Sequence, residues 1–225
     1  MSATGRVEVA KLLLNGEGIN INKPIGTTEG VRSTSLCITS FMGHTEIVKL
    51  LLADESVDVN KASDNGRTSL YIASTRGHVE IVKLLLAAKG VDVNKATKES
   101  TILHATSERG HIEIVKLLLD AEGIEVDATV TGEEMSLHIA VTMGHSEIVK
   151  LLLNAGSDVK KMAADGCTSL HAVALLGHVD IVKLLLDADE IEVDMASDNG
   201  TALDMATKIV HTEIQTLLRA AAAQE

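Results

Sequence analysis

Hydrophobic positions along the chain follow a helical spacing in segments that recur about every 33 residues. The segment Ile-Val-Lys-Leu-Leu-Leu occurs five times, each time after a Gly-His pair, and its copies begin at Ile47, Ile81, Ile114, Ile148 and Ile181. Tandem units of this length bury their apolar side chains against their neighbours, because no single unit can enclose its own. The pattern therefore predicts a stack of repeated units and not a single globular core.

One unit, residues 64–97, shows the elements that we expect in each copy. Asp64 to Arg67 is typical of a turn, and Thr68 is a good residue to cap a first helix, which we place at residues 69–75. Gly77 ends this helix, since glycine adopts a left-handed conformation at little cost. A second helix follows from residue 79 to about residue 88, with apolar residues on more than one side, as a stacked helix requires.

These marks resemble the ankyrin repeat. A Leu-His pair in the first helix ends at His104, His138 and His171, and a Val-Asp-Val-Asn mark ends at Asn60 and Asn94. The tetratricopeptide repeat has a similar period, but its aromatic and proline marks are missing here. The resemblance covers nearly the whole chain. It implies an all-α ankyrin-repeat solenoid of stacked helix-turn-helix units with β-turn or hairpin fingers.

We expect a single ankyrin-repeat domain over residues 1–225. Residues 1–32 form a partial N-terminal repeat with a long loop, because a second-helix pattern from Arg6 to Leu14 has no first helix before it. Residues 33–199 hold five full repeats. Residues 200–225 form a degenerate C-terminal capping repeat, in which Val210-His211 replaces Gly-His and Gln215 introduces a polar side chain.

The net charge restricts the class of partner. The formal net charge is −12, and the sequence shows no cluster of Lys and Arg that would offset it. Nucleic acid and anionic membranes repel such a surface. We therefore expect a protein partner, basic if it is charged, and neither nucleic acid nor a membrane.

The two cysteines, Cys37 and Cys167, lie four repeats apart in the expected stack, which is too far for a disulfide bond. Free thiols favour a reducing compartment. No apolar run reaches the roughly 18–20 residues of a membrane span. We expect a cytoplasmic monomer, with the nucleus as the alternative location.

The sequence offers no pattern that indicates catalysis. Its histidines recur once per repeat, so that they cannot converge on one metal ion, and we expect them to tie neighbouring turns by hydrogen bonds. No Gly-x-Ser-x-Gly motif and no phosphate-binding loop occurs. We therefore expect a protein that is not an enzyme and that has no catalytic residues, no metal and no cofactor.

The ends of the first helices carry apolar residues where solvent-facing positions would be polar. The resemblance to ankyrin proteins implies that these positions and the finger tips form the surface that contacts a partner. Exposed apolar side chains in one strip also mark a binding surface. The alternative is that some of them fold inward and cap the stack. The candidate partner-binding residues are Phe41, Met42, Arg67, Arg76, Arg109, Met143, Leu175 and Leu176.

Two further features come from comparison with the ankyrin pattern. Asn60 and Asn94 occupy the position at which finger asparagines resemble substrates of asparaginyl hydroxylases, while their simpler role is to fix the finger backbone by hydrogen bonds. The proline that opens the first helix in the family pattern is missing here, with Ser69 and Ser169 in two of its places.

The function that we expect is protein–protein interaction by a scaffold that binds a partner through its concave face and finger tips. One alternative is an ankyrin fragment of a larger multidomain protein that acts as a docking arm or spring. Another is an engineered, consensus-like scaffold without a natural partner, which the near-identical repeat motifs favour and the uneven loops oppose. Fold alone does not name the partner or the pathway.

Overall fold

The computed structural model describes residues 8, 20–26, 30–130 and 134–223, and the chain divides into two compact units. Unit 1 comprises residues 1–98 and 120–123, and unit 2 comprises residues 99–119 and 124–225. Apart from residue 8, the helix that we expected from Arg6 to Leu14 lies outside the described residues. The domain boundaries expected from the sequence stay a prediction.

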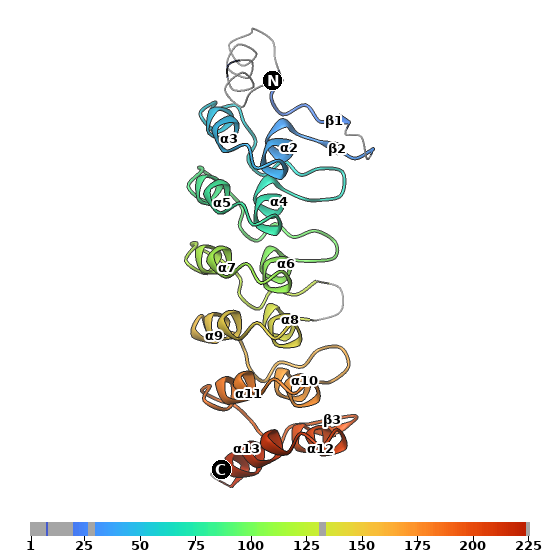
Figure 1. The fold of residues 1–225 in the computed structure, drawn as a ribbon. Helices are drawn as coiled ribbons and strands as arrows, with labels where there is room; N and C mark the ends of the chain where they lie inside the picture. Colours follow the sequence, from blue (N-terminus) through green and yellow to red (C-terminus); the bar gives the residue numbers. More distant parts are fainter. Residues whose placement is uncertain (1–7, 9–19, 27–29, 131–133, 224–225) are drawn as a thin grey trace. The chain divides into compact units, whose positions relative to one another are not determined.

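Unit 1 contains two helical hairpins in its described part, α2 (Ser35–Phe41) with α3 (Thr45–Leu52) and α4 (Ser69–Thr75) with α5 (Val79–Leu86). The first helices α2 and α4 pack side by side, as do the second helices α3 and α5 (Figure 1). Helix α4 has the predicted bounds, and α5 ends two residues before the predicted residue 88.

Unit 2 contains four hairpins in its described part, and their helices form two rows (Figure 1). The row of first helices comprises α6 (Ile102–Glu108), α8 (Ser136–Thr142), α10 (Ser169–Leu176) and α12 (Ala202–Lys208). The row of second helices comprises α7 (Ile112–Leu119), α9 (Ser146–Asn154), α11 (Val179–Leu186) and α13 (Thr212–Ala222). Each helix packs against its hairpin partner and against the next helix of its own row.

The hairpins form where the sequence places caps and glycines. The Thr68 hydroxyl accepts a hydrogen bond from the Tyr71 backbone N–H at 3.1 Å, which satisfies one of the free N–H groups at the start of α4. Gly77 follows the same helix with a φ of +77°, a left-handed conformation in which the chain reverses into α5. The capping roles predicted for these two residues are confirmed.

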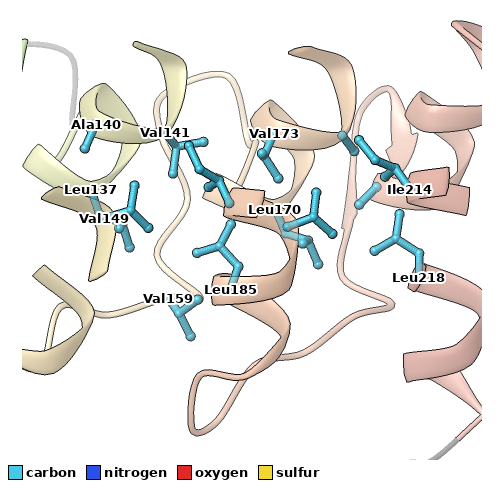
Figure 2. Packing of buried hydrophobic residues seen from close by; sticks show 14 of the residues in the cluster. Leu137, Ala140, Val141, Val149, Val159, Leu170, Val173, Leu185, Ile214 and Leu218 are labelled. Atoms are coloured by element: carbon cyan, nitrogen blue, oxygen red, sulfur yellow. The ribbon is translucent and has the colours of Figure 1, made fainter. Parts of the chain in front are cut away.

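The repeated Ile-Val-Lys-Leu-Leu-Leu motif supplies the core. In α5 the first, second and fifth residues of the motif, Ile81, Val82 and Leu85, are buried, whereas Leu84 and Leu86 are half-buried and Lys83 is exposed. In unit 2 the equivalent residues of α9 and α11, together with Val115 of α7, join one apolar cluster with Leu137, Leu170 and other buried residues of the first helices (Figure 2). Each second helix is therefore covered on more than one side, as predicted.

Extended fingers connect the hairpins, and two of them contain short antiparallel ladders. β1 (Ile25–Gly26) pairs with β2 (Arg32–Ser33) in unit 1, within the connection that is longer than its equivalents. β3 (Ala196–Ser197) pairs with β4 (Gly200–Thr201) in unit 2. The fingers place their turns beside the C-terminal ends of the first helices, where the candidate contact residues lie.

Candidate functional site

The C-terminal ends of the first helices in unit 2 expose a row of apolar side chains. The exposed fractions are 48% for Met143, 49% for Leu175, 42% for Leu176, 42% for Ile209 and 71% for Val210. These residues end α8, α10 and α12, which are successive neighbours in the row of first helices. The side chains face solvent and do not fold inward. We call these five residues the unit 2 strip.

Unit 1 presents an aromatic and cationic surface at the equivalent ends of its first helices. Phe41 and Met42 end α2 and are exposed, and Arg76 ends the neighbouring helix α4. The Arg76 guanidinium carbon lies 3.7 Å from the centroid of the Phe41 ring, within the range of a cation–π contact. The stacked pair holds the Arg76 charge in a fixed position at the surface.

The two remaining candidate arginines lie at different places. Arg67 is exposed on the finger turn before α4, and its guanidinium carbon lies 6.0 Å from the centroid of the Tyr71 ring. Arg109 is exposed at the C-terminal end of α6 in unit 2. Within unit 1, Phe41, Met42 and Arg76 come together, while Met143, Leu175 and Leu176 do so within unit 2.

A hollow of about 470 Å³ lies beside the unit 2 strip, between α10 and α12. Its apolar wall is made by Ala172, Leu175 and Leu176 of α10 and by Met205 of α12. Asp165 and Lys208 lie at its edge, and the Lys208 ammonium group donates to the Asn199 carbonyl at 2.8 Å. We call this site the apolar hollow.

A second hollow, of about 260 Å³, lies between α6 and α8 on the same face of unit 2. The carboxylate side chains Glu99, Glu108 and Glu134 line it, together with apolar side chains that include Ile139 and Met143. We call it the acidic hollow. Neither hollow was predicted from the sequence, because each one is formed by side chains from two fingers and from two or three helices.

The three histidines of the Leu-His marks are buried within unit 2. The backbone N–H groups of Thr101 and Thr168 donate to Nδ1 of His104 and His171 at 3.3 and 3.2 Å. Burial lowers the pKa of His104, His138 and His171, and nearby backbone carbonyl groups oppose that effect. The imidazoles of His104 and His171 are therefore neutral parts of the helix caps of α6 and α10 at pH 7.

The histidines of the Gly-His pairs tie neighbouring hairpins, as predicted. Nε2 of His78 lies 3.3 Å from the Phe41 carbonyl oxygen in unit 1, and Nε2 of His145 lies 3.3 Å from the Glu108 carbonyl oxygen in unit 2. A carbonyl can only accept, so that Nε2 carries the proton in both. No group of three metal-ligating side chains occurs within the described ranges.

The finger asparagines connect successive fingers in unit 1. The Asn60 side-chain amide donates to the Gly90 carbonyl at 2.7 Å, and its oxygen accepts from the Asp92 N–H at 2.8 Å. The Asn94 amide donates to the Gly123 carbonyl at 2.7 Å. Both side chains thus fix the finger backbone, as the simpler interpretation predicted. Hydroxylation of Asn60 and Asn94 stays a prediction.

Cys167 lies in a finger of unit 2 and is half-buried at the edge of the apolar hollow. Burial raises the pKa of its thiol, and the nearby Asp165 carboxylate adds to that effect. A raised pKa disfavours the thiolate, the form that reacts as a nucleophile.

None of the helices in the described part is long and apolar enough to cross a membrane.

Comparison with known proteins agrees with the repeat geometry. A family model described as ankyrin repeats (3 copies) matches residues 1–97, 89–163 and 137–224, and the chain therefore belongs to the ankyrin-repeat family. The crystal structure of EF0377, an ankyrin repeat protein, is similar to this chain with a TM-score of 0.77 and 28% sequence identity, and the match covers 82% of this chain and 96% of that chain. No curated protein matches the chain.

The family and fold confirm the fold class predicted from the sequence. Ankyrin repeats are generally protein-interaction modules, and the fold is typically a non-catalytic scaffold. Ile209 and Val210 are additions to the predicted site residues. Their signal in the sequence was the replacement by Val210 of the glycine that follows each of the preceding first helices, next to the apolar residue Ile209.

Proposed function

We propose that this protein is a non-catalytic interaction module of the cytoplasm or nucleus that binds a protein partner through the first-helix ends and finger tips of its repeats. The observation that carries the proposal is the unit 2 strip. Exposed apolar side chains at the ends of successive helices mark a surface that a partner covers, and Met adapts to irregular partner surfaces.

The mechanism that we propose is recognition by a pre-ordered surface. The strip side chains stand at the ends of helices whose opposite faces are packed in the core, so that their backbone does not move when a partner binds. In unit 1 the contact between Arg76 and Phe41 fixes a cation in the same way. Less conformational entropy is then lost on association than a flexible loop would lose.

The test is capture of partners by the full chain, followed by cross-linking and affinity measurement. In the variant M143S/L175S/L176S the affinity for the captured partner falls at least tenfold, because apolar anchors dominate such interfaces. The matched control is Ile112→Ser, which removes an exposed apolar side chain from the second helix α7 and leaves the affinity unchanged. An unchanged affinity in the triple variant shows that the strip is not the binding site.

In the alternative function the repeats serve as a docking arm of a larger protein. We then expect the same first-helix ends and finger tips to contact the partner. The two alternatives differ in the length of the full gene product, which intact-mass measurement of the endogenous protein determines. An additional domain in that product favours the docking arm. The absence of any additional domain favours an independent module.

A further inference from the structure

We propose that unit 2 binds an extended segment of its partner in which an apolar side chain and a basic side chain stand about five to six residues apart. This inference rests on the proposed function and specifies the chemistry of the partner. It assigns the apolar side chain to the apolar hollow and the basic side chain to the acidic hollow.

The two hollows lie on either side of the end of α8. Thr142, the last residue of α8, lines the apolar hollow, and Met143, the next residue, lines the acidic hollow. Both hollows are bounded by first-helix ends and by fingers, and both therefore open on one face of unit 2. A segment that crosses the end of α8 contacts both of them.

The apolar hollow suits a Leu, Ile, Met or Phe side chain. Its wall of Leu175, Leu176, Ala172 and Met205 is continuous with the exposed unit 2 strip, and its volume of about 470 Å³ is ample for one such side chain. The one cation on its edge, among the described residues, is Lys208, whose ammonium group is held by the Asn199 carbonyl. A large apolar side chain that enters this hollow removes apolar surface from water on both partners.

The acidic hollow complements a Lys or Arg side chain. Glu108 and Glu134 are exposed carboxylates on its rim, and in the part of the chain that the structure describes neither forms an ion pair. Val130, Ile139 and Met143 provide an apolar floor along which the aliphatic stem of a basic side chain can lie. The net charge of −12 also favours approach of a basic segment.

The position of Glu108 agrees with a role in binding. It is the last residue of α6, where the helix dipole disfavours a negative charge. The stability of the fold therefore gives no reason for a carboxylate at this end. A positive charge from a partner would compensate it.

The spacing follows from the packing of the first helices. Neighbouring helix axes lie roughly 8–10 Å apart, and the hollow between α6 and α8 is separated from the hollow between α10 and α12 by two such steps, or roughly 16–20 Å. An extended chain rises about 3.3 Å per residue, so that the two side chains stand about five to six residues apart.

The experiment is a selection of displayed random 16-residue peptides on the immobilised full chain, followed by anisotropy titrations with the most enriched peptide. We expect enriched peptides to carry an apolar residue and a Lys or Arg about five to six residues apart. The variant E108Q/E134Q then binds the peptide roughly tenfold more weakly at low salt, and the difference shrinks at high salt. In that variant, replacing the basic residue of the peptide by Ala causes no further loss.

A control variant with the same loss of charge is E113Q/D189N, whose two side chains lie on the second helix α7 and after α11, outside both hollows. It should bind the peptide like the unmodified chain. Circular dichroism of each variant verifies that it is folded.

Two results would overturn the inference in different ways. If L175S/L176S abolishes binding but E108Q/E134Q does not weaken it, or if the enriched peptides lack a basic residue, the partner chemistry is wrong and the proposed function stands. If L175S/L176S binds the peptide as tightly as the unmodified chain, or if no peptide is enriched, the proposed surface itself is wrong.

Discussion

The imidazole ring of His145 packs against Gly110, so closely that a Cβ atom on this glycine would stand 3.0 Å from Cε1 of the ring. The same ring reaches the Glu108 carbonyl with Nε2 at 3.3 Å, so that one histidine joins two successive hairpins of unit 2. The repeated Gly-His pair thus supplies a contact between neighbouring repeats, because the histidine of one repeat packs against the glycine of the preceding repeat.

Gly110→Ala should destabilise unit 2. The alanine meets two penalties, the left-handed φ of +71° and the contact with His145, and we expect a loss of about 2–3 kcal/mol in the free energy of unfolding measured by urea denaturation. Gly156→Ala is the matched control, because its φ is +83° and a Cβ there has nothing within 4 Å. A control that loses as much as Gly110→Ala would show that the imidazole contact contributes nothing.

Ser169→Pro should raise the melting temperature. Ser169 is the first residue of α10, where proline loses no helical hydrogen bond, and the preceding Thr168 has a ψ of 170° that suits a following proline. The buried Ser169 hydroxyl has no hydrogen-bond partner among the described residues, and its removal adds to the gain. We expect about 0.4–1 kcal/mol by calorimetry.

Ser69→Pro provides a comparison for that variant. The Ser69 hydroxyl donates to the Cys37 sulfur at 3.4 Å, and the proline would remove this contact. The gain should therefore be smaller than at Ser169. A lower melting temperature for both variants would mean that the start of these helices is assigned to the wrong residue.

The free energy of unfolding should decrease as the pH falls below about 6.5. Burial holds the pKa of His104, His138 and His171 below the unfolded value of about 6.5, so that the unfolded chain binds more protons in this range. The stability from these groups is complete above that pH and is lost as the pH falls through their lower folded pKa values. Protonation of His104 also removes the acceptor of the Thr101 N–H.

Urea midpoints between pH 7.5 and pH 5 measure this dependence. The variant H104Q/H171Q retains a side-chain acceptor for the cap N–H groups and cannot become charged, so that its stability changes less with pH. A slope equal to that of the unmodified chain would exclude these two histidines as the cause.

Val210→Gly should stabilise the fold and weaken partner binding. Val210 has a φ of +65°, in the left-handed region that disfavours a β-branched residue, and its side chain is 71% exposed. We expect a gain of about 1 kcal/mol in calorimetry and a lower affinity for the captured partner. A variant that is more stable and binds equally well would remove Val210 from the strip.

The local elements of the fold could be predicted from the sequence because each depends on nearby residues. Thr68 caps α4 through a residue three positions away, and Gly77 ends it through its own backbone conformation. The period of the apolar motif then predicts that each second helix is buried on more than one side. The contact between the His145 ring and the Glu108 carbonyl of the preceding repeat could also be predicted, because the Gly-His pair recurs in each full repeat.

The surface chemistry was less accessible from the sequence. The exposure of Leu175 and Leu176 could be predicted from their position before Gly177, but the hollow beside them requires Met205, which is far along the chain. The contact of Arg76 with Phe41 depends on rotamers that no pattern specifies. Glu108 and Glu134 look like ordinary solvated carboxylates until packing places both beside Met143.

Hydrogen–deuterium exchange of the full chain, with and without its captured partner, tests most directly that the first-helix ends bind the partner. We predict slower exchange in peptides that contain residues 142–143, 175–176 and 208–210, and unchanged exchange in the second helices α7, α9 and α11. Protection confined to those second helices, with the first-helix ends unaffected, would contradict it.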